Sequence, residues 1–324
     1  MIPKAELHVH LEGTIRPEIA KNLALRNHLN FPNHLLDHSQ FFYRSNGFMD
    51  FLKAYDELAA LIRQPQDYFD ITYDYLKQSA LKGVIYCEMM YSPDHAEKVS
   101  QIPSREHLIA IGEAILKAQN DYGIIGRIIT TAVRHFGVEA CEKVALHAKL
   151  EPFSFVSGFG LGGDELGFPP QLFKKTYDMA RDAGLKTTVH AGEWGNAQSM
   201  KTAINICQVD RIGHGVRAIE DENILSMLKD LQIPLEICPT SNVVLGIYPR
   251  IEDHPFPLFM AQGIMVSINS DDPPFMSTTI DKEYDLVQKT FQYSDETMKA
   301  ISRQAIEVAF IDKDLKTELL KKII

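Results

Sequence analysis

Several histidines and acidic residues stand at the ends of short apolar runs, far apart along the chain. His8 and His10 are separated by one residue, so in an extended strand both imidazoles point to the same side. His190, His214 and Asp271 each end or follow another apolar run. Imidazoles and carboxylates are ligands of Zn²⁺, which in catalytic sites keeps a position for water and lowers the pKa of that water to about 7. We therefore expect a hydrolytic metal site built from this set.

Each of these signals is weak when taken alone. A His-X-His pair or a lone histidine is often structural, and the Asp-Asp-Pro sequence at 271–273 is also good turn chemistry. The combination is more specific, because every member stands at the same end of its run. Related barrel hydrolases often bridge two metals with a carboxylated lysine after the fourth strand, where this chain reads SFVSGFGLGGDE without a lysine. We therefore expect one zinc ion per chain.

The elements that must position these residues alternate between strands and helices. Eight strands alternating with helices predict a (β/α)8 TIM barrel of the α/β class, whose active site forms at the C-terminal ends of the strands. The expected strands are Ala5–His10, Val84–Tyr91, Gly126–Arg134, Phe153–Leu161, Lys186–His190, Val209–His214, Pro234–Ile237 and Gly263–Asn269. The expected helices include His107–Asp121, Gln171–Ala183, Ile219–Asp230 and Lys282–Gln292.

One region interrupts this alternation. Residues 16–79 have helical periodicity and no convincing strand, which predicts a helical insertion after the first strand, folded onto the barrel. A separate N-terminal helical domain is the weaker alternative, because a strand precedes the region. We expect one domain over residues 1–324. Phe48, Phe51 and Leu52 look like an apolar helix face, for which packing is favoured over closure above a ligand. His135 either lines the pocket or packs.

Composition narrows the class of protein. The chain has 324 residues, is 45% hydrophobic and carries a net charge of -10, which argues against an extended nucleic-acid surface but not against a small nucleotide-like ligand. The four cysteines form no CxxC pair, so reduced buried thiols are expected. No apolar run approaches the ~18 residues of a membrane span, and the N-terminus lacks a signal-peptide pattern. We expect a cytoplasmic protein without a membrane or nucleic-acid partner; nothing in the sequence indicates an oligomeric state.

The motifs AELHVHLEGT, HAGE, RIGHG and SINSDDP occur in this order, with GFGLGGDE between the first two. Together they resemble the adenosine deaminase family of the amidohydrolase superfamily, and they span residues 5–275. The resemblance implies a (β/α)8 barrel that removes the 6-amino group of an adenine-type purine. It also implies which of the candidate residues hold the zinc ion. These are His8, His10, His190 and Asp271.

The resemblance further implies roles around the substrate. Glu193 would protonate the purine N1 while water attacks C6, and His214 would orient that water and stabilise the developing charge. Asp272 would hydrogen-bond N7, and the backbone N–H of Gly163 would face N3. Asp271 and His10 would take part beside the substrate as well as in the metal site.

The role of Glu193 also makes chemical sense by itself. Attack at C6 breaks the aromaticity of the ring and moves electron density onto N1, so a carboxylic acid at N1 stabilises the intermediate. Such an acid must be protonated when substrate binds, which requires a pKa raised by a dry pocket. The alternative is that Glu193 is a first-turn acid that favours a helix dipole, and that His214 is a turn histidine.

The substrate is less clearly indicated than the reaction. Family members that act on adenosine commonly read HxHLDG, in which the Asp reaches the ribose 5′-hydroxyl, whereas this chain has Glu12. Glu is common in relatives that act on free adenine or on other adenine nucleosides. The LGGDE loop, in contrast, matches nucleoside deaminases better. We expect adenosine, with 2′-deoxyadenosine, to be the substrate. The alternatives are adenine, converted to hypoxanthine, and a modified adenine nucleoside.

Other functions fit less well. A metal-dependent phosphoesterase or amidase on the same barrel would need more metal ligands and a basic phosphate clamp. A binding protein without catalysis would be expected to have lost Glu193 or a ligand, and all are present. The cytidine-deaminase type is excluded because the HxE…PCxxC signature is absent from the sequence.

Overall fold

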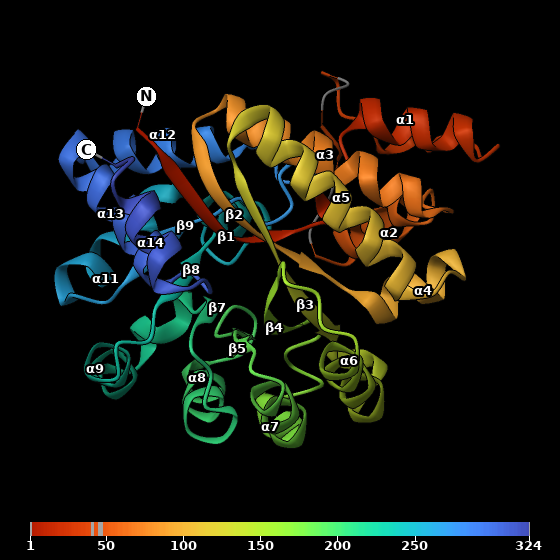
Figure 1. Cartoon of the computed structure of the whole chain (residues 1–324). Helices are drawn as coiled ribbons and strands as arrows, with labels where there is room; N and C mark the ends of the chain where they lie inside the picture. Colours follow the sequence, from red (N-terminus) through yellow and green to blue (C-terminus); the bar gives the residue numbers. More distant parts are fainter. Residues whose placement is uncertain (1, 40–41, 45–47, 324) are drawn as a thin grey trace.

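A computed structural model describes residues 2–39, 42–44 and 48–323. Short parallel strands form a barrel with helices packed around its outside (Figure 1). One set of strands is ordered β1-β2-β3-β4-β5 and a second set β6-β7-β8-β9, and every pairing is parallel. The strands are β1 (Lys4–His10), β2 (Val84–Tyr91), β3 (Ile125–Val133), β4 (Val156–Gly162), β5 (Lys186–Thr187), β6 (His190–Ala191), β7 (Ile212–His214), β8 (Leu235–Ile237) and β9 (Val266–Ile268).

Hydrogen bonds join the two sets of strands into a closed barrel. On one side the N–H of His10 donates to the Asp271 carbonyl at 2.9 Å, and the N–H of Asp271 donates to the His8 carbonyl at 3.2 Å. On the other side the Thr188 N–H donates to the Phe159 carbonyl at 2.9 Å. The fifth expected strand is therefore present but interrupted at Thr188 and Val189, which separates β5 from β6. The predicted (β/α)8 barrel is confirmed.

The later strands are shorter than the sequence pattern predicted. The run Gly263–Asn269 contains only the three residues of β9, because Gly263 ends helix α11 (Phe256–Gln262) in a left-handed conformation with φ of +76°. The run Val209–His214 contains only β7, because the N–H groups of Asp210 and Arg211 both donate to the Thr187 carbonyl and the Thr187 N–H donates to the Asp210 carboxylate at 2.8 Å, which breaks the regular ladder. The apolar runs in the sequence are therefore longer than the strands that form.

The region between β1 and β2 is helical, as predicted, but its last helix belongs to the barrel. Helices α1 (Pro17–Arg26) and α2 (Phe48–Ala59) are additions to the barrel pattern. Helix α3 (Pro65–Leu81), in contrast, packs against β2 and against α5 (Ser104–Tyr122), as a crossover helix does. A capping box between Gln64 and Asp67 starts α3. The insertion proper is therefore shorter than 16–79.

The other helices cover the barrel and close the end away from the histidines. Helices α13 (Asp295–Val308) and α14 (Lys313–Leu320) bring Ile306 and Leu319 onto Ala5, Leu7 and Tyr86 near the starts of β1 and β2. Among the described residues, no helix is both long and apolar enough to cross a bilayer. The remaining helices are α4 (Pro93–Ser100), α6 (Val138–Leu150), α7 (Lys174–Asp182), α8 (Ala197–Thr202), α9 (Glu222–Asp230), α10 (Pro239–Val244) and α12 (Ile280–Phe291).

Candidate active site

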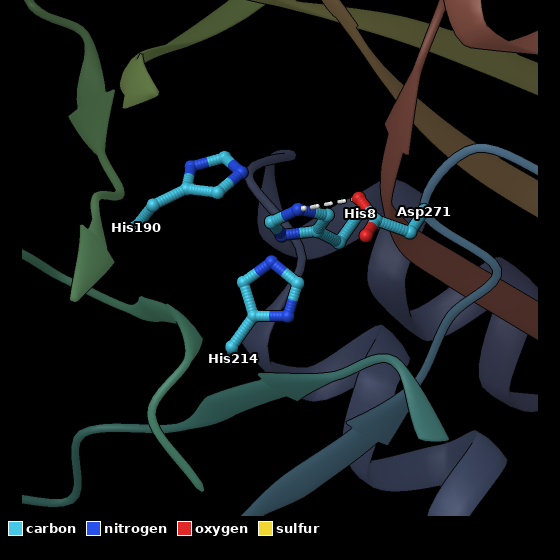
Figure 2. Close-up of side chains that lie close together, drawn as sticks. All are labelled: His8, His190, His214 and Asp271. Atoms are coloured by element: carbon cyan, nitrogen blue, oxygen red, sulfur yellow. Dashed lines mark ion pairs between the residues drawn. The ribbon is translucent and has the colours of Figure 1, made fainter. Parts of the chain in front are cut away.

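Four buried side chains from four different elements converge at the C-terminal ends of the strands (Figure 2). His8 comes from β1, His190 from β6, His214 from β7 and Asp271 from the turn after β9. One ligand atom of each lies within 4.8 Å of the others. The expectation that widely spaced residues meet in one place is therefore fulfilled by the fold, and the group has the composition of a metal site.

His10 belongs to the same cluster and forms a second group with Asp271 and Asp272. Its Nε2 lies 3.1 Å from Nε2 of His190 and 3.5 Å from Oδ1 of Asp271, and Nε2 of His8 is also 3.5 Å from that oxygen. A tetrahedral metal with bonds of about 2.0–2.1 Å separates its ligand atoms by about 3.3–3.4 Å. These three distances are close to that separation, although His10 falls in a different group from His8 and His190, and the group of four includes His214 in its place.

The hydrogen bonds of His8 orient its ring so that Nε2 faces the other members of the cluster. Its Nδ1 donates to Oε2 of Glu236 at 2.8 Å, which leaves Nε2 as the free ligand atom. This buried Nε2 has no hydrogen-bond partner within the described ranges of the chain. His190 is held in the same way, because its Nδ1 donates to the Leu161 carbonyl at 3.2 Å. Imidazoles oriented by a partner on the far nitrogen are typical of metal ligands.

Glu236 lies behind His8 in a buried ionic network. It accepts hydrogen bonds from Arg211 Nε at 2.6 Å and from Thr188 Oγ1 at 3.0 Å, and Arg211 also bonds Glu88. Burial alone would raise the pKa of Glu236, but Arg211 and His8 outweigh it and lower the pKa to about 2. Glu236 is therefore an ionised acceptor that fixes the tautomer of His8. The sequence analysis did not identify it; a Glu in the run PLEIC was the available signal.

Asp271 is held in an unusual backbone conformation by its neighbours. Its φ is +63°, a left-handed value that a non-glycine residue adopts at a cost of about 1–3 kcal/mol. The Ser241 hydroxyl donates to Oδ2 at 2.6 Å, and Glu6 accepts a hydrogen bond from the Ser270 N–H at 3.0 Å. Burial opposes its ionisation, but the surrounding histidines, His8 first, lower the pKa of Asp271 well below its ordinary value. The carboxylate is thus ionised and directed at the histidines.

Glu193 and His214 face one another beside this cluster. Oε1 of Glu193 is buried, lies 3.6 Å from Nδ1 of His214 and has no hydrogen-bond partner among the described residues. Burial, with the charges of Asp271 and Glu165, raises the pKa of Glu193 well above its ordinary value. Burial also lowers the pKa of His214 to about 3. Burial therefore favours the uncharged forms of both the Glu193 carboxyl group and the His214 imidazole, which lie side by side.

His214 is oriented by residues that the sequence analysis did not single out. The Asn242 amide donates to Nδ1 of His214 at 3.3 Å, and Oδ1 of Asn242 accepts from Nε2 of His254 at 3.2 Å. Asn242 belongs to α10, which also carries Ser241. The polar sequence Pro-Thr-Ser-Asn after the β8 run was the signal for this helix. One short helix thus orients both His214 and Asp271.

Asp272 points an unpaired oxygen into the site. Within the described residues its buried Oδ1 has no hydrogen-bond partner, and burial with the Asp271 charge raises the pKa of Asp272 well above its ordinary value. Gly13 allows this placement, because a Cβ on Gly13 would overlap Oδ1. Burial therefore favours the protonated form of Asp272, which can donate a hydrogen bond to a ligand.

A cavity of about 350 Å³ opens over these groups. His10, Glu193, His214 and both aspartates line it, and Gly163 at φ of +97° forms part of the wall. Phe51, Leu52 and Tyr55 of α2 also line it, together with His135 and Trp194. Packing alone was expected for Phe51 and Leu52, so that expectation is corrected: α2 folds back over the barrel mouth. The side chain of Phe48 lies outside the described part of the structure.

Glu12 is placed differently from the expected substrate contact. Its buried carboxylate accepts hydrogen bonds from the hydroxyls of Tyr68 at 3.0 Å and Tyr55 at 3.3 Å, and Glu12 is not among the residues that line the cavity. Burial raises the pKa of Glu12. The residue thus holds Tyr55 in the cavity wall, and Tyr55 is the residue that contacts the open space.

Comparison with known proteins agrees with this geometry. The family model described as adenosine deaminase matches residues 3–324. An adenine deaminase of Chelativorans sp. (strain BNC1) is 40% identical over 323 residues, which cover 100% of this chain and 98% of that protein. Other relatives at 36–38% identity, from Mesorhizobium and Rhizobium among others, also bear the name adenine deaminase.

Solved structures give the same picture. The crystal structure of adenine deaminase from Arthrobacter aurescens superposes with a TM-score of 0.91 at 30% identity, covering 100% of this chain and 98% of that one. An amidohydrolase from Burkholderia ambifaria with bound Zn superposes with a TM-score of 0.89 at 27% identity, covering 98% and 88% of the two chains. One of these similar structures has bound Zn, and the buried His/Asp cluster of this chain has the composition of a metal site.

Proposed function

The chain belongs to the adenosine deaminase family and is a hydrolytic deaminase, and within that family we propose that its substrate is adenine, converted with water to hypoxanthine and ammonia. The observation that carries the proposal is the pair of buried carboxyl groups of Glu193 and Asp272 beside the histidine cluster. One oxygen of each has no hydrogen-bond partner among the described residues, and burial raises the pKa of both. Ring nitrogens of a purine are acceptors, so they pair with acids that still hold a proton.

Three groups of the chain match three ring nitrogens of the purine. Glu193 donates its proton to N1 as water attacks C6, which stabilises the loss of aromaticity. Asp272 donates a hydrogen bond to N7, and the Gly163 N–H donates to N3. Each of these groups donates a hydrogen bond to a ring nitrogen. Together they fix the orientation of the ring, with C6 toward the histidine cluster. This arrangement favours attack at the carbon that bears the amino group.

The metal proposed for the cluster is Zn²⁺, held by His8, His10, His190 and Asp271. When bound there it supplies an activated water at neutral pH. Because Nδ1 of the neutral His214 accepts a hydrogen bond from Asn242, its Nε2–H is the donor that orients the oxygen of the attacking water toward C6. Asp271, which is ionised, accepts the proton that the water loses on attack. That proton passes to N6, the C6–N6 bond breaks and ammonia leaves, and the hydroxyl proton at C6 returns to the Glu193 carboxylate to give hypoxanthine.

The choice of adenine over adenosine reverses our preference from the sequence. The relatives at 36–40% identity over nearly the whole chain are named adenine deaminases. The carboxylate of Glu12 faces Tyr55 and Tyr68 and does not line the cavity, so it is not placed to accept a ribose hydroxyl. Adenosine remains the second candidate, because a cavity of about 350 Å³ falls within the 300–1,000 Å³ range of pockets that hold drug-sized ligands.

The test is an ultraviolet assay of the purified protein on adenine, adenosine and 2′-deoxyadenosine side by side. We expect kcat/KM for adenine to exceed that for adenosine by at least about 100-fold, which corresponds to about 2.7 kcal/mol of transition-state discrimination. A preference for adenosine would overturn the choice of substrate. Activity on none of the three would direct the search to modified adenines.

A further inference from the structure

Glu165, in the loop after β4, binds the loop that carries Glu193. Its Oε1 accepts hydrogen bonds from the Gly192 N–H at 2.6 Å and the Ser199 hydroxyl at 2.8 Å. Its Oε2 accepts from the N–H groups of Glu193 at 3.2 Å and Trp194 at 3.0 Å. The side chain is buried, and a carboxylate can accept about four such bonds. Glu165 is therefore fully engaged by one short segment, residues 192–199.

The backbone of this segment is shaped to receive a carboxylate. Three consecutive N–H groups point at one anion, which is the geometry of a backbone nest, and Gly192 has the positive φ of +72° that such nests use. A Cβ on Gly195 would overlap Oε1 of Glu165, so the close approach depends on glycine there as well. The backbone around Gly192 and Gly195 is thus complementary to the Glu165 side chain.

The same segment is held from its other side by Arg217. The backbone N–H of Arg217 donates to the Gly192 carbonyl at 2.9 Å, and its Nε donates to the Glu193 carbonyl at 2.9 Å. The N–H groups of the segment thus go to Glu165 and two of its carbonyls go to Arg217. By contrast, the reactive oxygen Oε1 of Glu193 has no hydrogen-bond partner among the described residues. The direction of the Glu193 side chain therefore depends on its backbone.

We propose that Glu165 is a positioning residue for Glu193, which holds the acid at the distance from the substrate that proton transfer requires. The inference rests on the proposed function of Glu193 as the acid. A displacement of about 1 Å in a reacting group costs about 100-fold in rate. Loss of the carboxylate should therefore slow the chemical step while the residues that bind the metal and the other ring nitrogens stay in place.

The principal test is Glu165→Gln, in which one oxygen becomes an NH₂ group that faces backbone N–H donors. We expect kcat to fall about 10- to 100-fold, with KM for adenine changed by less than about threefold and the zinc content unchanged. The matched control is Asp164→Asn, because Asp164 caps only its own loop, through the N–H groups of Leu166 and Gly167. This control should keep wild-type kcat.

Two further measurements separate positioning from general loss of structure. If Glu165 acts through Glu193, the double variant Glu165→Gln/Glu193→Gln should be no slower than Glu193→Gln alone, whereas independent effects would multiply. Hydrogen exchange should become faster at the amides of Gly192, Glu193 and Trp194 in Glu165→Gln. Multiplying effects, or unchanged exchange with unchanged kcat, would overturn the proposal.

A second variant tests the proposal if Glu165→Gln does not fold. Arg217→Met, at a half-buried side chain, loosens the same segment through its carbonyls and should lower kcat in the same way. Unchanged kcat in Arg217→Met would then overturn the proposal. Failure of the proposed function is distinguishable: wild-type protein without purine deaminase activity rejects the function, whereas the hydrogen-exchange result reports on the Glu165 contact alone.

Discussion

His10 and Asp271 meet twice, once through the backbone and once through their side chains. The His10 N–H donates to the Asp271 carbonyl at 2.9 Å, and Nε2 of His10 lies 3.5 Å from Oδ1 of Asp271. The first contact closes the barrel between its first and last strands. The second brings two proposed metal ligands together. Closure of the fold and assembly of the site therefore depend on the same pair of residues.

Removal of Asp271 should abolish metal binding. Asp271→Ala deletes one ligand of the proposed set, and zinc occupancy should fall from near one per chain to a small fraction, measured by elemental analysis of the purified protein. Chelation of the wild-type protein should lower Tm, because a ligand bound only by the folded state stabilises it by about 2.7 kcal/mol at 100 times its Kd. Full zinc occupancy in Asp271→Ala would refute the ligand set.

Glu193→Gln should separate catalysis from metal binding. The amide keeps the shape of the side chain but has no proton to transfer, so we expect kcat to fall by about 10²–10⁴-fold. The zinc content should stay at the wild-type value, because Glu193 is not a proposed ligand. Steady-state kinetics with adenine and elemental analysis on one preparation make the comparison. Turnover equal to that of wild type would eliminate the acid role.

Glu236→Gln tests the residue behind His8. The amide can no longer act as an ionised acceptor for Nδ1, so the orientation and basicity of His8 are both weakened. We expect zinc affinity to fall by about 10- to 100-fold, measured by competition with a chelator of known affinity. Glu220→Gln, at a half-exposed residue paired with Arg217, is the matched control and should bind zinc as wild type does. Equal affinities in the two variants would contradict the role of Glu236.

Tyr55 should influence substrate choice. Tyr55→Ala removes the aromatic wall that Glu12 holds and releases one hydrogen bond from its carboxylate. The ratio of kcat/KM for adenosine to that for adenine should rise by at least about tenfold, or about 1.4 kcal/mol. Tyr73→Phe, at a tyrosine whose hydroxyl bonds Asp121 away from the cavity, should leave the ratio unchanged. A constant ratio in Tyr55→Ala would show that this wall does not discriminate.

His107 should make stability depend on pH. This buried imidazole accepts from the Tyr91 hydroxyl at 3.0 Å and donates to Ser100 Oγ at 3.1 Å, and burial lowers the pKa of His107 to about 4. Between the folded value near 4 and the ordinary value of 6.5, the unfolded chain binds more protons. The free energy of unfolding therefore falls as pH falls through this window, and the contribution is complete above it.

Substitution of His107 checks this sign. His107→Gln keeps a donor and an acceptor but does not titrate. Between pH 7 and pH 5 the variant should lose about 2 kcal/mol less of its free energy of unfolding than wild type does, measured by urea denaturation. Equal losses in the two proteins would show that His107 does not titrate differently in the folded and unfolded states.

Residues at strand ends were predictable because strand periodicity and barrel topology together dictate where they lie. His8, His190 and Asp271 are such residues, and the fold brings them together without any further information. Contacts that cross the barrel were not predictable. Glu165 and Glu236 are buried acids whose partners are 27 and 25 or more residues away, and nothing local distinguishes them from surface acids.

The sequence also could not predict how individual side chains are oriented. At Glu12 the sequence indicated the residue that differs from the adenosine-type pattern, but not that Tyr55 of α2 and Tyr68 of α3 bind its carboxylate. The wall formed by α2 depends on the path of a long connection, which periodicity does not give. The fifth strand is likewise interrupted at Thr188, between a first part that pairs with β4 and a second part that pairs with β7. The apolar run Lys186–His190 gives no sign of this change of partner.

The overlap between Gly13 and Asp272 has a consequence for how this chain can vary. Gly13 has no positive φ that would explain its glycine; only the position of Oδ1 excludes a Cβ. In a library of all substitutions at position 13, even alanine should therefore be rejected. A smaller residue at position 272 would restore tolerance at 13 while removing the purine contact. Residues 13 and 272 would then vary together. Position 13 could carry a side chain only where residue 272 no longer makes the proposed contact with the purine.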